Sequence, residues 1–328
     1  MLRKDVRKVS RSASGTADPG KIARFDALAE EWWKPDGAFK MIHAFNRVRV
    51  THLFERLPIL LQRDPRTAGP LAGMKIIDVG CGAGLVTEPI SRLGAAVIGI
   101  DAAERNVLVA ERHARSTGAS VQYQHALPEE LADQGRVFDA VISLEVVEHV
   151  ADLPVFLNEL ARLVAPGGIL VIGTLNRTIR SFVKAIVGAE YVLRWMPRGT
   201  HDWRKFVTPG ELDLSLRRHG FRMVERCGVA LNPISRQWTI SEDDSVTYLQ
   251  FPSKDLFLLT RREGALLLPA HIDQAAKYRV QAIPHMILEL GSLSASHTRG
   301  RAFALRRLRI SSGYRIAAAR AFASIAAD

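Results

Sequence analysis

Short apolar runs alternate with amphipathic stretches over the middle of the chain. The runs are bounded by glycine, proline or polar residues, which indicates buried strands. They cover residues 75–79, 96–100, 121–123, 138–144 and 169–174. Between them, residues 85–93, 107–116 and 153–164 place apolar side chains at helical spacing. This alternation of strand and helix predicts a parallel sheet with helices on both faces.

Two helical segments precede this core, and a pair of strands follows it. Residues 21–33 have apolar side chains at helical spacing, and a Pro-Asp-Gly sequence at 35–37 separates them from a second helical stretch at 39–57. Proline and glycine together favour a break in the chain. We therefore expect an N-terminal helical cap. Residues 221–227 and 245–251 predict a closing pair of strands.

The net charge of +11 over 328 residues is concentrated at the two ends of the chain. Residues 1–20 hold five Lys and Arg against two acidic residues, and residues 255–328 hold eleven against five. We predict a mobile basic tail at 1–20, a domain at 21–254 and a basic C-terminal extension at 255–328. A nucleic-acid-binding protein is one alternative, but the near-neutral body of the chain disfavours a nucleic-acid partner.

Composition excludes several classes of protein. Two cysteines, Cys81 and Cys227, cannot form a disulfide scaffold, and no set of Cys and His has the spacing of a zinc site. No apolar stretch approaches the roughly 18 residues of a membrane span, and the N-terminus lacks the apolar region of a secretory signal. We therefore expect a cytoplasmic protein with reduced cysteines.

A glycine-rich turn follows the first predicted strand. It runs Asp-Val-Gly-Cys-Gly-Ala-Gly over residues 78–84 and is followed by Leu85, where a dinucleotide fingerprint requires Gly or Ala. A cofactor without phosphate and with a cationic sulfonium suits the turn and its preceding Asp78 better. Asp101 ends the next strand, where a carboxylate can accept hydrogen bonds from ribose hydroxyls. The alternative is that Asp101 only caps the following helix.

These residues resemble the motifs of class I S-adenosylmethionine-dependent methyltransferases. The glycine turn, Asp101, the run Phe-Asp-Ala-Val-Ile at 138–142 and the segment Leu-Val-Ala-Pro-Gly-Gly at 163–168 match four successive motifs in order and spacing. The resemblance implies an α/β, Rossmann-like fold. Its sheet would have seven mostly parallel strands, the last of them antiparallel, with helices on both faces. The implied cofactor is S-adenosylmethionine.

A closer resemblance surrounds this core. From about residue 21 to residue 251 the chain is similar to the ubiquinone-biosynthesis O-methyltransferases, which methylate ring hydroxyls of polyprenylated catechol and quinol intermediates. The similarity lies in Trp32-Trp33, Phe39-Lys40, Asn46 with Arg49, and the segments 145–150, 174–177, 187–191 and 199–203. Arg47 and Thr247 depart from the family's Asn-Pro-x-Arg and Val-Asn-Tyr patterns, which leaves substrate detail open. Methylation of another small molecule, at oxygen or nitrogen, is the alternative.

The resemblance also assigns site residues. It implies cofactor contacts at Arg49, Gly80, Gly82, Asp101 and Leu144. It implies divalent-metal ligands, for Mg²⁺ or a similar ion, at Glu145, Glu148 and His149. On a helical turn these three side chains would share one face. Without a metal, Glu145 or His149 would be the general base that removes the phenolic proton.

Two further segments are expected near the substrate. His201, a third catalytic candidate, lies with Asp202 and Trp203 in a predicted loop that could close over the substrate. Trp32 and Trp33 could form an apolar lid over a prenylated ring. The alternative for the two tryptophans is ordinary packing of an amphipathic helix, which we expect for one of them.

An apolar stripe at 179–187 predicts a membrane contact. Its members, Ile179, Phe182, Val183, Ile186 and Val187, follow the spacing i, i+3, i+4, i+7, i+8. Arg177, Arg180 and Lys184 occupy other faces, and Tyr191, Arg194 and Trp195 follow. We therefore expect peripheral association with an anionic membrane, the inner membrane of a bacterium. The alternative is a helix that covers the sheet or a dimer contact. The resemblance implies a polyprenylated phenol or quinol as substrate and names other ubiquinone-biosynthesis enzymes as candidate partners.

Overall fold

The computed structural model describes residues 15–34, 37, 39–192, 199–232, 235 and 237–255. Of the tail expected at 1–20, only residues 15–20 are described, and they belong to the domain. Asp18 caps the first helix by accepting hydrogen bonds from the Gly20 and Lys21 N–H groups. The extension expected at 255–328, apart from Asp255, lies outside the described residues, as do Arg194 and Trp195.

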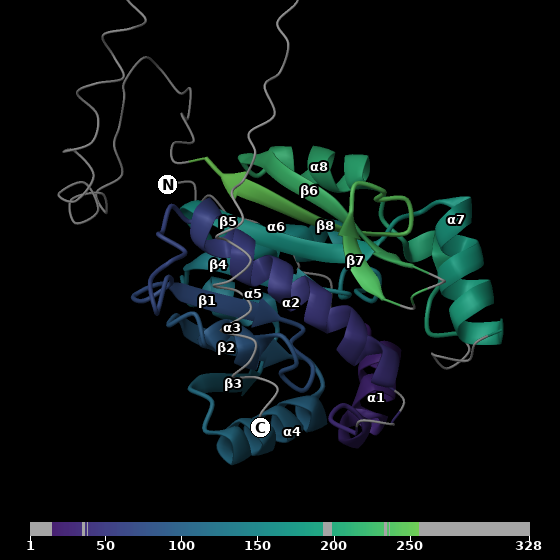
Figure 1. Cartoon of the computed structure of the whole chain (residues 1–328), viewed down its shortest axis with the longest axis horizontal. Helices are drawn as coiled ribbons and strands as arrows, with labels where there is room; N and C mark the ends of the chain where they lie inside the picture. Colours follow the sequence, from purple (N-terminus) through teal and green to yellow (C-terminus); the bar gives the residue numbers. More distant parts are fainter. Residues whose placement is uncertain are drawn as a thin grey trace, which may run out of the picture. The chain divides into compact units, whose positions relative to one another are not determined.

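Within the described residues, eight strands form one sheet in the order β3-β2-β1-β4-β5-β8-β6-β7 (Figure 1). Strands β1 to β5 are parallel, and β8, β6 and β7 join them in antiparallel pairs. The bounds are Lys75–Val79 (β1), Ala96–Asp101 (β2), Val121–His125 (β3), Phe138–Leu144 (β4), Val164–Leu175 (β5), Phe221–Leu231 (β6), Trp238–Ser241 (β7) and Thr247–Lys254 (β8). The mostly parallel α/β sheet is confirmed.

The expected number of seven strands is wrong by one, and the additional strand is β7. Strand β6 continues to Leu231, past its expected end at residue 227. The chain then folds back, and β7 pairs with the last residues of β6, from Gly228 opposite Ser241 to Leu231 opposite Trp238. An extended strand end presents unpaired N–H and C=O groups, and β7 satisfies them.

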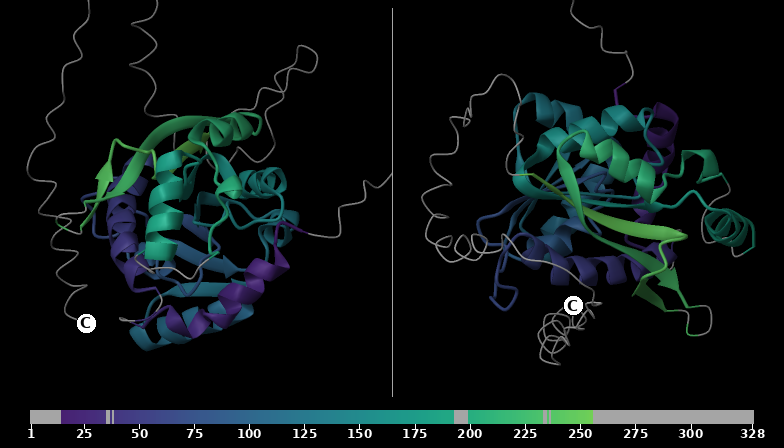
Figure 2. Two further views of the ribbon diagram at one scale, coloured as in Figure 1. Left: turned by 90° about the vertical axis from the view of Figure 1, so that its right-hand side faces the viewer. Right: turned by 90° about the horizontal axis from the view of Figure 1, so that it is seen from above.

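Helices cover both faces of the sheet, as expected (Figure 2). Their bounds are Pro19–Ala27 (α1), Ala29–Glu31 (η1), Lys40–Leu60 (α2), Thr87–Ser91 (α3), Glu104–Thr117 (α4), Pro128–Asp133 (α5), Leu153–Leu163 (α6), Ile179–Ser181 (α7), Phe182–Val192 (η2), Trp203–Lys205 (η3) and Pro209–Arg217 (α8). Successive strand residues point to opposite faces. Ile76 packs in the cluster formed with α2 and α3, whereas Ile77 packs in the cluster formed with α6 and α8.

The short helices α5 and α8 were not expected from the hydrophobic pattern. Each is under ten residues long and begins with a proline, Pro128 or Pro209. Helix α8 did carry a local signal: the Thr208 hydroxyl accepts the Glu211 N–H, and the Glu211 carboxylate accepts the Thr208 N–H. Such a capping box is recognisable in the sequence Thr-Pro-Gly-Glu.

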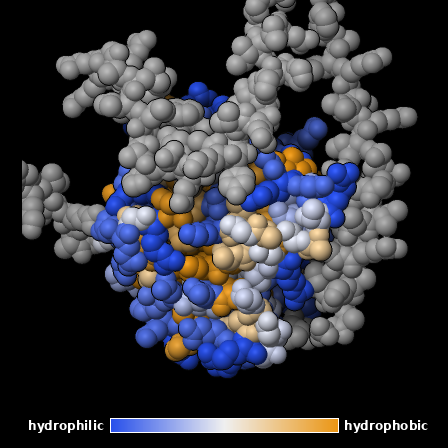
Figure 3. Space-filling view, turned by 90° about the vertical axis from the view of Figure 1, so that its left-hand side faces the viewer, coloured by the Kyte–Doolittle hydropathy of each residue, from blue (hydrophilic) through white to orange (hydrophobic). Residues whose placement is uncertain are grey.

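The apolar stripe at 179–187 lies on a helix at one end of the domain. Helix α7 continues directly into η2, a π-helix, and the pair projects beyond the sheet (Figures 1 and 2). Figure 3 shows the opposite end, where apolar side chains are interspersed with hydrophilic ones. None of the helices among the described residues combines the length and the hydrophobicity that crossing a bilayer requires.

Candidate active site

A cavity of about 670 Å³ opens at the carboxyl ends of β1, β2 and β4. This edge is where open α/β sheets bind ligands, because the strand order reverses there and leaves a crevice. The N-terminal segment and η2 complete the wall, through side chains such as Ile22 and Val183. Parts of the chain that are distant in sequence therefore enclose one site.

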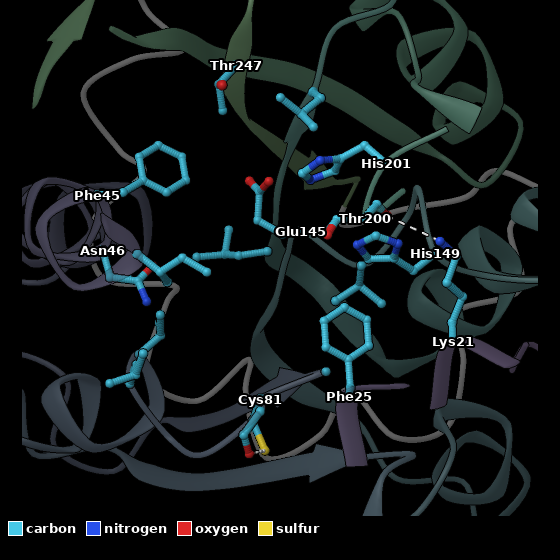
Figure 4. A pocket seen from close by; sticks show the side chains of 18 of the residues that line it. Lys21, Phe25, Phe45, Asn46, Cys81, Glu145, His149, Thr200, His201 and Thr247 are labelled. Atoms are coloured by element: carbon cyan, nitrogen blue, oxygen red, sulfur yellow. Dashed lines mark hydrogen bonds between the residues drawn. The ribbon is translucent and has the colours of Figure 1, made fainter. Parts of the chain in front are cut away.

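Figure 4 shows how the side chains are arranged around this cavity. His149 and His201 lie on one wall, and Phe45 lies on the opposite wall. The carboxylate of Glu145 points into the space between them, and Cys81 lies at the glycine-turn end. The cavity thus joins the expected cofactor residues to the expected catalytic residues.

The glycine turn after β1 requires its glycines. Gly80, Gly82 and Gly84 have φ angles of 76°, 54° and 90°, which L-residues with a Cβ rarely adopt. A Cβ on Gly80 would lie 2.4 Å from a methyl carbon of Val146, and one on Gly82 would lie 3.2 Å from the Trp32 ring. The turn therefore allows both the 145–149 segment and the N-terminal segment to approach the cavity closely.

Three successive backbone donors of this turn are already used within the protein. The Gly80 and Cys81 N–H groups donate to the Ile100 carbonyl at 2.8 and 3.0 Å, and the Gly82 N–H donates to the Asp101 carboxylate at 2.8 Å. A pyrophosphate is normally bound by free N–H groups of such a turn. The arrangement therefore favours a cofactor without phosphate, in agreement with the expectation from Leu85.

Ribose binding by Asp101 stays a prediction, and the same carboxylate holds Ala103, the residue that precedes α4. Asp101 lines the cavity at the end of β2, and its carboxylate accepts the Ala103 N–H at 2.8 Å. The Asn106 side-chain Nδ2 donates to the same carboxylate at 3.3 Å, and Trp32 Nε1 donates to the Asn106 side-chain Oδ1 at 3.0 Å. Although these hydrogen bonds oppose it, burial raises the pKa of Asp101.

Arg49 brings the cofactor region next to the expected catalytic segment. Its guanidinium, 3% exposed, donates from Nη1 to Glu145 Oε1 at 2.9 Å and from Nε to Asn46 Oδ1 at 3.1 Å. It also lies over the Phe45 ring, with Cζ 4.0 Å from the centroid. Leu144, the last residue of β4, lines the same cavity. Nothing in the sequence indicated the Arg49–Glu145 ion pair, because the two residues are 96 positions apart.

The structure does not support the expected metal site at Glu145, Glu148 and His149. The segment after β4 is a turn and not a helix, since Glu145 has a φ of 58° and the His149 N–H donates to the Val146 carbonyl. The three side chains therefore share no helix face. In the described part of the chain, no three His, Cys, Asp or Glu side chains are grouped to hold a metal ion.

The three side chains of this segment have different surroundings. Glu145 is paired with Arg49. Glu148 is buried, and the Thr174 hydroxyl donates to it at 2.8 Å. Burial, followed by repulsion from Glu145, raises the pKa of Glu148 to about 8. The His149 ring meets Phe25 edge-on at 5.2 Å, and its buried Nδ1 has no hydrogen-bond partner among the described residues.

His149 and His201 are neighbours with different protonation properties. Their ring centroids are 6.1 Å apart. Burial lowers the pKa of His149 to about 3, and the positive charges of Lys21, Lys205 and Arg24, together with His201, contribute in the same direction. His149 is therefore a poor proton acceptor near neutral pH, in contrast to its expected catalytic role.

A buried carboxylate that sequence reasoning missed contacts His201. Glu190, on η2, is 1% exposed and accepts the His201 Nδ1 hydrogen bond at 2.8 Å. Although burial opposes it, the hydrogen bonds from His201 and Gly199 lower the pKa of Glu190. The available signal was the presence of both residues in separate segments, 187–191 and 199–203, that carry the family resemblance.

The two tryptophans of the N-terminal segment have different positions. Trp32 lines the cavity and stacks on Phe39, with centroids 3.9 Å apart. Trp33 stacks on His113 at 3.4 Å, and its Nε1 donates to the Ala83 carbonyl at 2.9 Å. Trp32 can therefore cover a ligand, whereas Trp33 anchors the segment to the domain.

Comparisons with known proteins show which family the chain resembles. A family model described as a methyltransferase domain matches residues 49–226. The chain is 48% identical over 237 residues to the ubiquinone biosynthesis O-methyltransferase of Azorhizobium caulinodans, which covers 72% of this chain and 94% of the relative. It is 45% identical to the protein of the same name from Rhizobium leguminosarum bv. trifolii, with coverages of 74% and 96%. A magnesium protoporphyrin IX methyltransferase from Synechocystis PCC 6803 is 20% identical, with a TM-score of 0.48 over 71% of this chain and 94% of that one.

Proposed function

This chain belongs to the ubiquinone biosynthesis O-methyltransferase family, and on that premise we propose that it methylates a ring hydroxyl of a polyprenylated catechol or quinol. The methyl donor of this S-adenosylmethionine-dependent enzyme class is S-adenosylmethionine. The observation that carries the proposal is the single cavity that connects the glycine turn and Asp101 with two histidines. A transferase of this kind needs donor and acceptor side by side, because orientation supplies much of the rate enhancement.

The residues around the glycine turn fit S-adenosylmethionine. Asp101 can accept hydrogen bonds from both ribose hydroxyls. Gly80 and Gly82 leave room for close approach, and Leu144 supplies an apolar contact at the end of β4. Arg49, whose guanidinium is fixed beside Glu145, is the cation suited to the cofactor carboxylate. When bound, S-adenosylmethionine supplies an electrophilic methyl group on a sulfonium.

The chain itself must remove the proton of the acceptor hydroxyl. A phenol has a pKa near 10 by analogy with tyrosine, so a base is needed near neutral pH. Glu145 is paired with Arg49, and the pKa of His149 is about 3. His201 lines the cavity, and its Nε2 has no hydrogen-bond partner among the residues that the structure describes. We therefore assign the general base to His201.

In the proposed reaction, His201 Nε2 accepts the phenolic proton while the phenol oxygen forms its bond to the methyl carbon. The carbon–sulfur bond breaks, its electron pair remains on sulfur, and the sulfonium charge is neutralised. The imidazolium then releases its proton to solvent. Because Glu145, Glu148 and His149 do not converge, these steps are assigned to side chains and not to a metal ion.

The remainder of the cavity suits a prenylated ring. Its walls include Phe25, Phe45, Leu231 and Trp238, from four different elements or loops. Their apolar surfaces can cover a ring and the first prenyl units and exclude water from the reacting oxygen. The cavity also reaches η2 through Val183, which connects the site with the projecting helix.

A methyl-transfer assay tests this function. The purified protein is incubated with S-adenosylmethionine and either a short-chain prenylated catechol or the corresponding quinol, and methyl ethers are identified by mass spectrometry. The same catechol with both hydroxyls already methylated is the control and should accept nothing. We expect His201→Gln to lower kcat on the order of 10²-fold. Binding of S-adenosylmethionine without transfer to any catechol or quinol would contradict the proposed substrate class.

We also propose that α7 and η2 attach the protein to an anionic membrane. Six apolar side chains there are exposed by 39–80%: Ile179, Phe182, Val183, Val187, Tyr191 and Val192. Such a cluster is costly in water but favourable in the headgroup region of a bilayer. Arg180 and Lys184 supply positive charge that an anionic surface attracts. A substrate with a polyprenyl tail resides in the bilayer, so the cavity mouth must reach it.

Vesicle sedimentation tests the membrane proposal. We expect the protein to sediment with anionic vesicles and not with neutral ones. The double substitution Ile179→Ser with Val187→Ser should weaken this association and leave S-adenosylmethionine binding unchanged. A matched control is Leu108→Ser with Leu214→Ser, which removes exposed apolar side chains from α4 and α8. Equal sedimentation of the two double variants would refute η2 as the membrane face.

A further inference from the structure

We infer that Glu190 is a positioning residue, whose carboxylate holds the His201 imidazole with Nδ1 protonated and Nε2 turned to the substrate. This inference rests on the proposed function, since it concerns the base of that reaction. It assigns a role to a residue that reaches the reaction only through His201.

The Glu190 carboxylate is fully engaged with the loop that carries His201. Its Oε1 accepts the His201 backbone N–H at 2.9 Å and the His201 Nδ1 hydrogen bond at 2.8 Å. Its Oε2 accepts the Gly199 N–H at 2.6 Å. The His201 side chain is 12% exposed and the Glu190 side chain 0%. Backbone and ring are thus held by one side chain, which leaves the imidazole little freedom to turn.

These contacts determine the tautomer of the ring. A carboxylate can only accept hydrogen bonds, so His201 Nδ1 must donate. In the neutral ring Nε2 then carries the lone pair. The ring lines the cavity on the same wall as His149 (Figure 4). The geometry therefore presents the proton-accepting atom to the space where a ring hydroxyl would bind.

Two cations contact the loop that carries His201. Lys21 Nζ donates to the Thr200 carbonyl at 3.2 Å, and Arg24 Nη1 donates to the Gly199 carbonyl at 2.7 Å, both from α1. The positive charges of Lys21 and Arg24 disfavour an additional positive charge on the nearby His201 ring. When His201 accepts a proton, the Glu190 carboxylate compensates the new charge in a site with little water.

Charged and titratable groups approach His201 from three parts of the chain. Helix α1 contributes Lys21 and Arg24, which donate to the Thr200 and Gly199 carbonyls, and the loop after β4 contributes His149, whose ring centroid is 6.1 Å away. Glu190 is the acidic partner that hydrogen-bonds to the ring. We expect its removal to permit the other tautomer.

Nitrogen NMR tests the tautomer on the unmodified full-length protein. With ¹⁵N-labelled histidine, the ring signal of His201 is identified by its loss in His201→Gln. We expect the pattern of a neutral ring protonated at Nδ1, converted to a mixture of tautomers in Glu190→Gln. A parent ring protonated at Nε2 would overturn the inference without any measurement of activity. If no catechol or quinol is methylated, the proposed function fails, but this result stands independently.

Kinetics separate positioning from a purely structural role. Glu190→Gln should lower kcat on the order of 10²-fold and leave the Kd of S-adenosylmethionine unchanged. In a His201→Gln background the same substitution should have no further effect on kcat. An equal loss in both backgrounds would show that Glu190 acts only on the fold.

Glu211→Gln is the matched control. Its carboxylate also accepts backbone and side-chain hydrogen bonds, from Thr208 and from Arg177, but it does not hydrogen-bond to His201. We expect a change in the thermal midpoint without a change in kcat. If Glu190→Gln does not fold, the tautomer of the parent protein still decides the inference.

Discussion

Removing the Asp101 carboxylate is expected to weaken S-adenosylmethionine binding by a predictable factor. A hydrogen bond to a charged group contributes about 1.5–3 kcal/mol. Since about 1.4 kcal/mol corresponds to a tenfold change in Kd, Asp101→Ala should raise the Kd roughly 10- to 150-fold. Titration calorimetry on the purified variant measures this change directly.

The same substitution also affects folding, because Asp101 joins two elements of the protein. It accepts the Gly82 N–H from the glycine turn and the Ala103 N–H at the start of α4. At about 0.5–1.5 kcal/mol per hydrogen bond, loss of these two acceptors costs roughly 1–3 kcal/mol of the free energy of unfolding. Binding must therefore be measured well below the lowered thermal midpoint.

A modified ligand distinguishes loss of a direct contact between Asp101 and the ribose from an indirect effect through a loosened glycine turn. An analogue of S-adenosylmethionine without ribose hydroxyls should bind the parent protein more weakly than S-adenosylmethionine does. The Asp101→Ala variant should bind the analogue and S-adenosylmethionine with equal affinity. Asp152→Ala is the control, since Asp152 caps α6 by accepting the Val155 N–H and does not line the cavity. It should lower stability by about 1 kcal/mol and leave the Kd unchanged. If parent and Asp101→Ala discriminated equally between the two ligands, Asp101 would not contact the ribose.

Three further predictions concern other parts of the domain. Burial raises the pKa of Glu148 to about 8 from an ordinary value of 4.5, so between these pH values the folded state binds more protons than the unfolded state. The stability of the protein should therefore fall as the pH rises from 5 to 8. The thermal midpoint of Glu148→Gln should fall less over the same range. Gly80→Ala should lose more stability than Gly118→Ala in denaturant titrations, because both positions have positive φ but only a Cβ on Gly80 meets Val146. A protein that ends at Asp255 should keep its thermal transition and its methyl transfer, since β8 is complete at Lys254; loss of either would show that the extension is required.

The parallel core of the fold could be predicted from the sequence because its information is local. Residues 75–79 and 138–144 are strands with the expected bounds, and buried parallel strands are continuous apolar runs flanked by turns. The glycine turn was recognisable for the same reason, since positive φ angles restrict it to glycine. Strand β7 was not predicted, because its four residues are too few to show a period and they are placed by pairing with the end of β6 and by contact of Trp238 with Phe45.

The candidate site was predicted as a set of residues, but their relations were decided by the tertiary structure. The sequence identified Arg49, Glu145, His149 and His201 as chemistry-bearing residues. The family resemblance implied a metal site whose ligands would share a helix face, yet Glu145 has a positive φ, the segment is a turn, and the Glu145 carboxylate pairs with Arg49. Backbone conformation at a single residue is set by what packs around it, and spacing alone cannot reveal it.

The sequence by itself located the cofactor edge of the sheet, because a glycine turn and a strand-end carboxylate are local features of the chain. Its resemblance to a known family of methyltransferases indicated the reaction class. Only the tertiary structure distinguishes His149 from His201 as candidate bases. Burial and neighbouring cations make His149 a weak one, and the Glu190 carboxylate orients His201. Basicity depends on charges and solvent within a few ångströms, and folding brings those groups together from α1, η2 and the loop after β4.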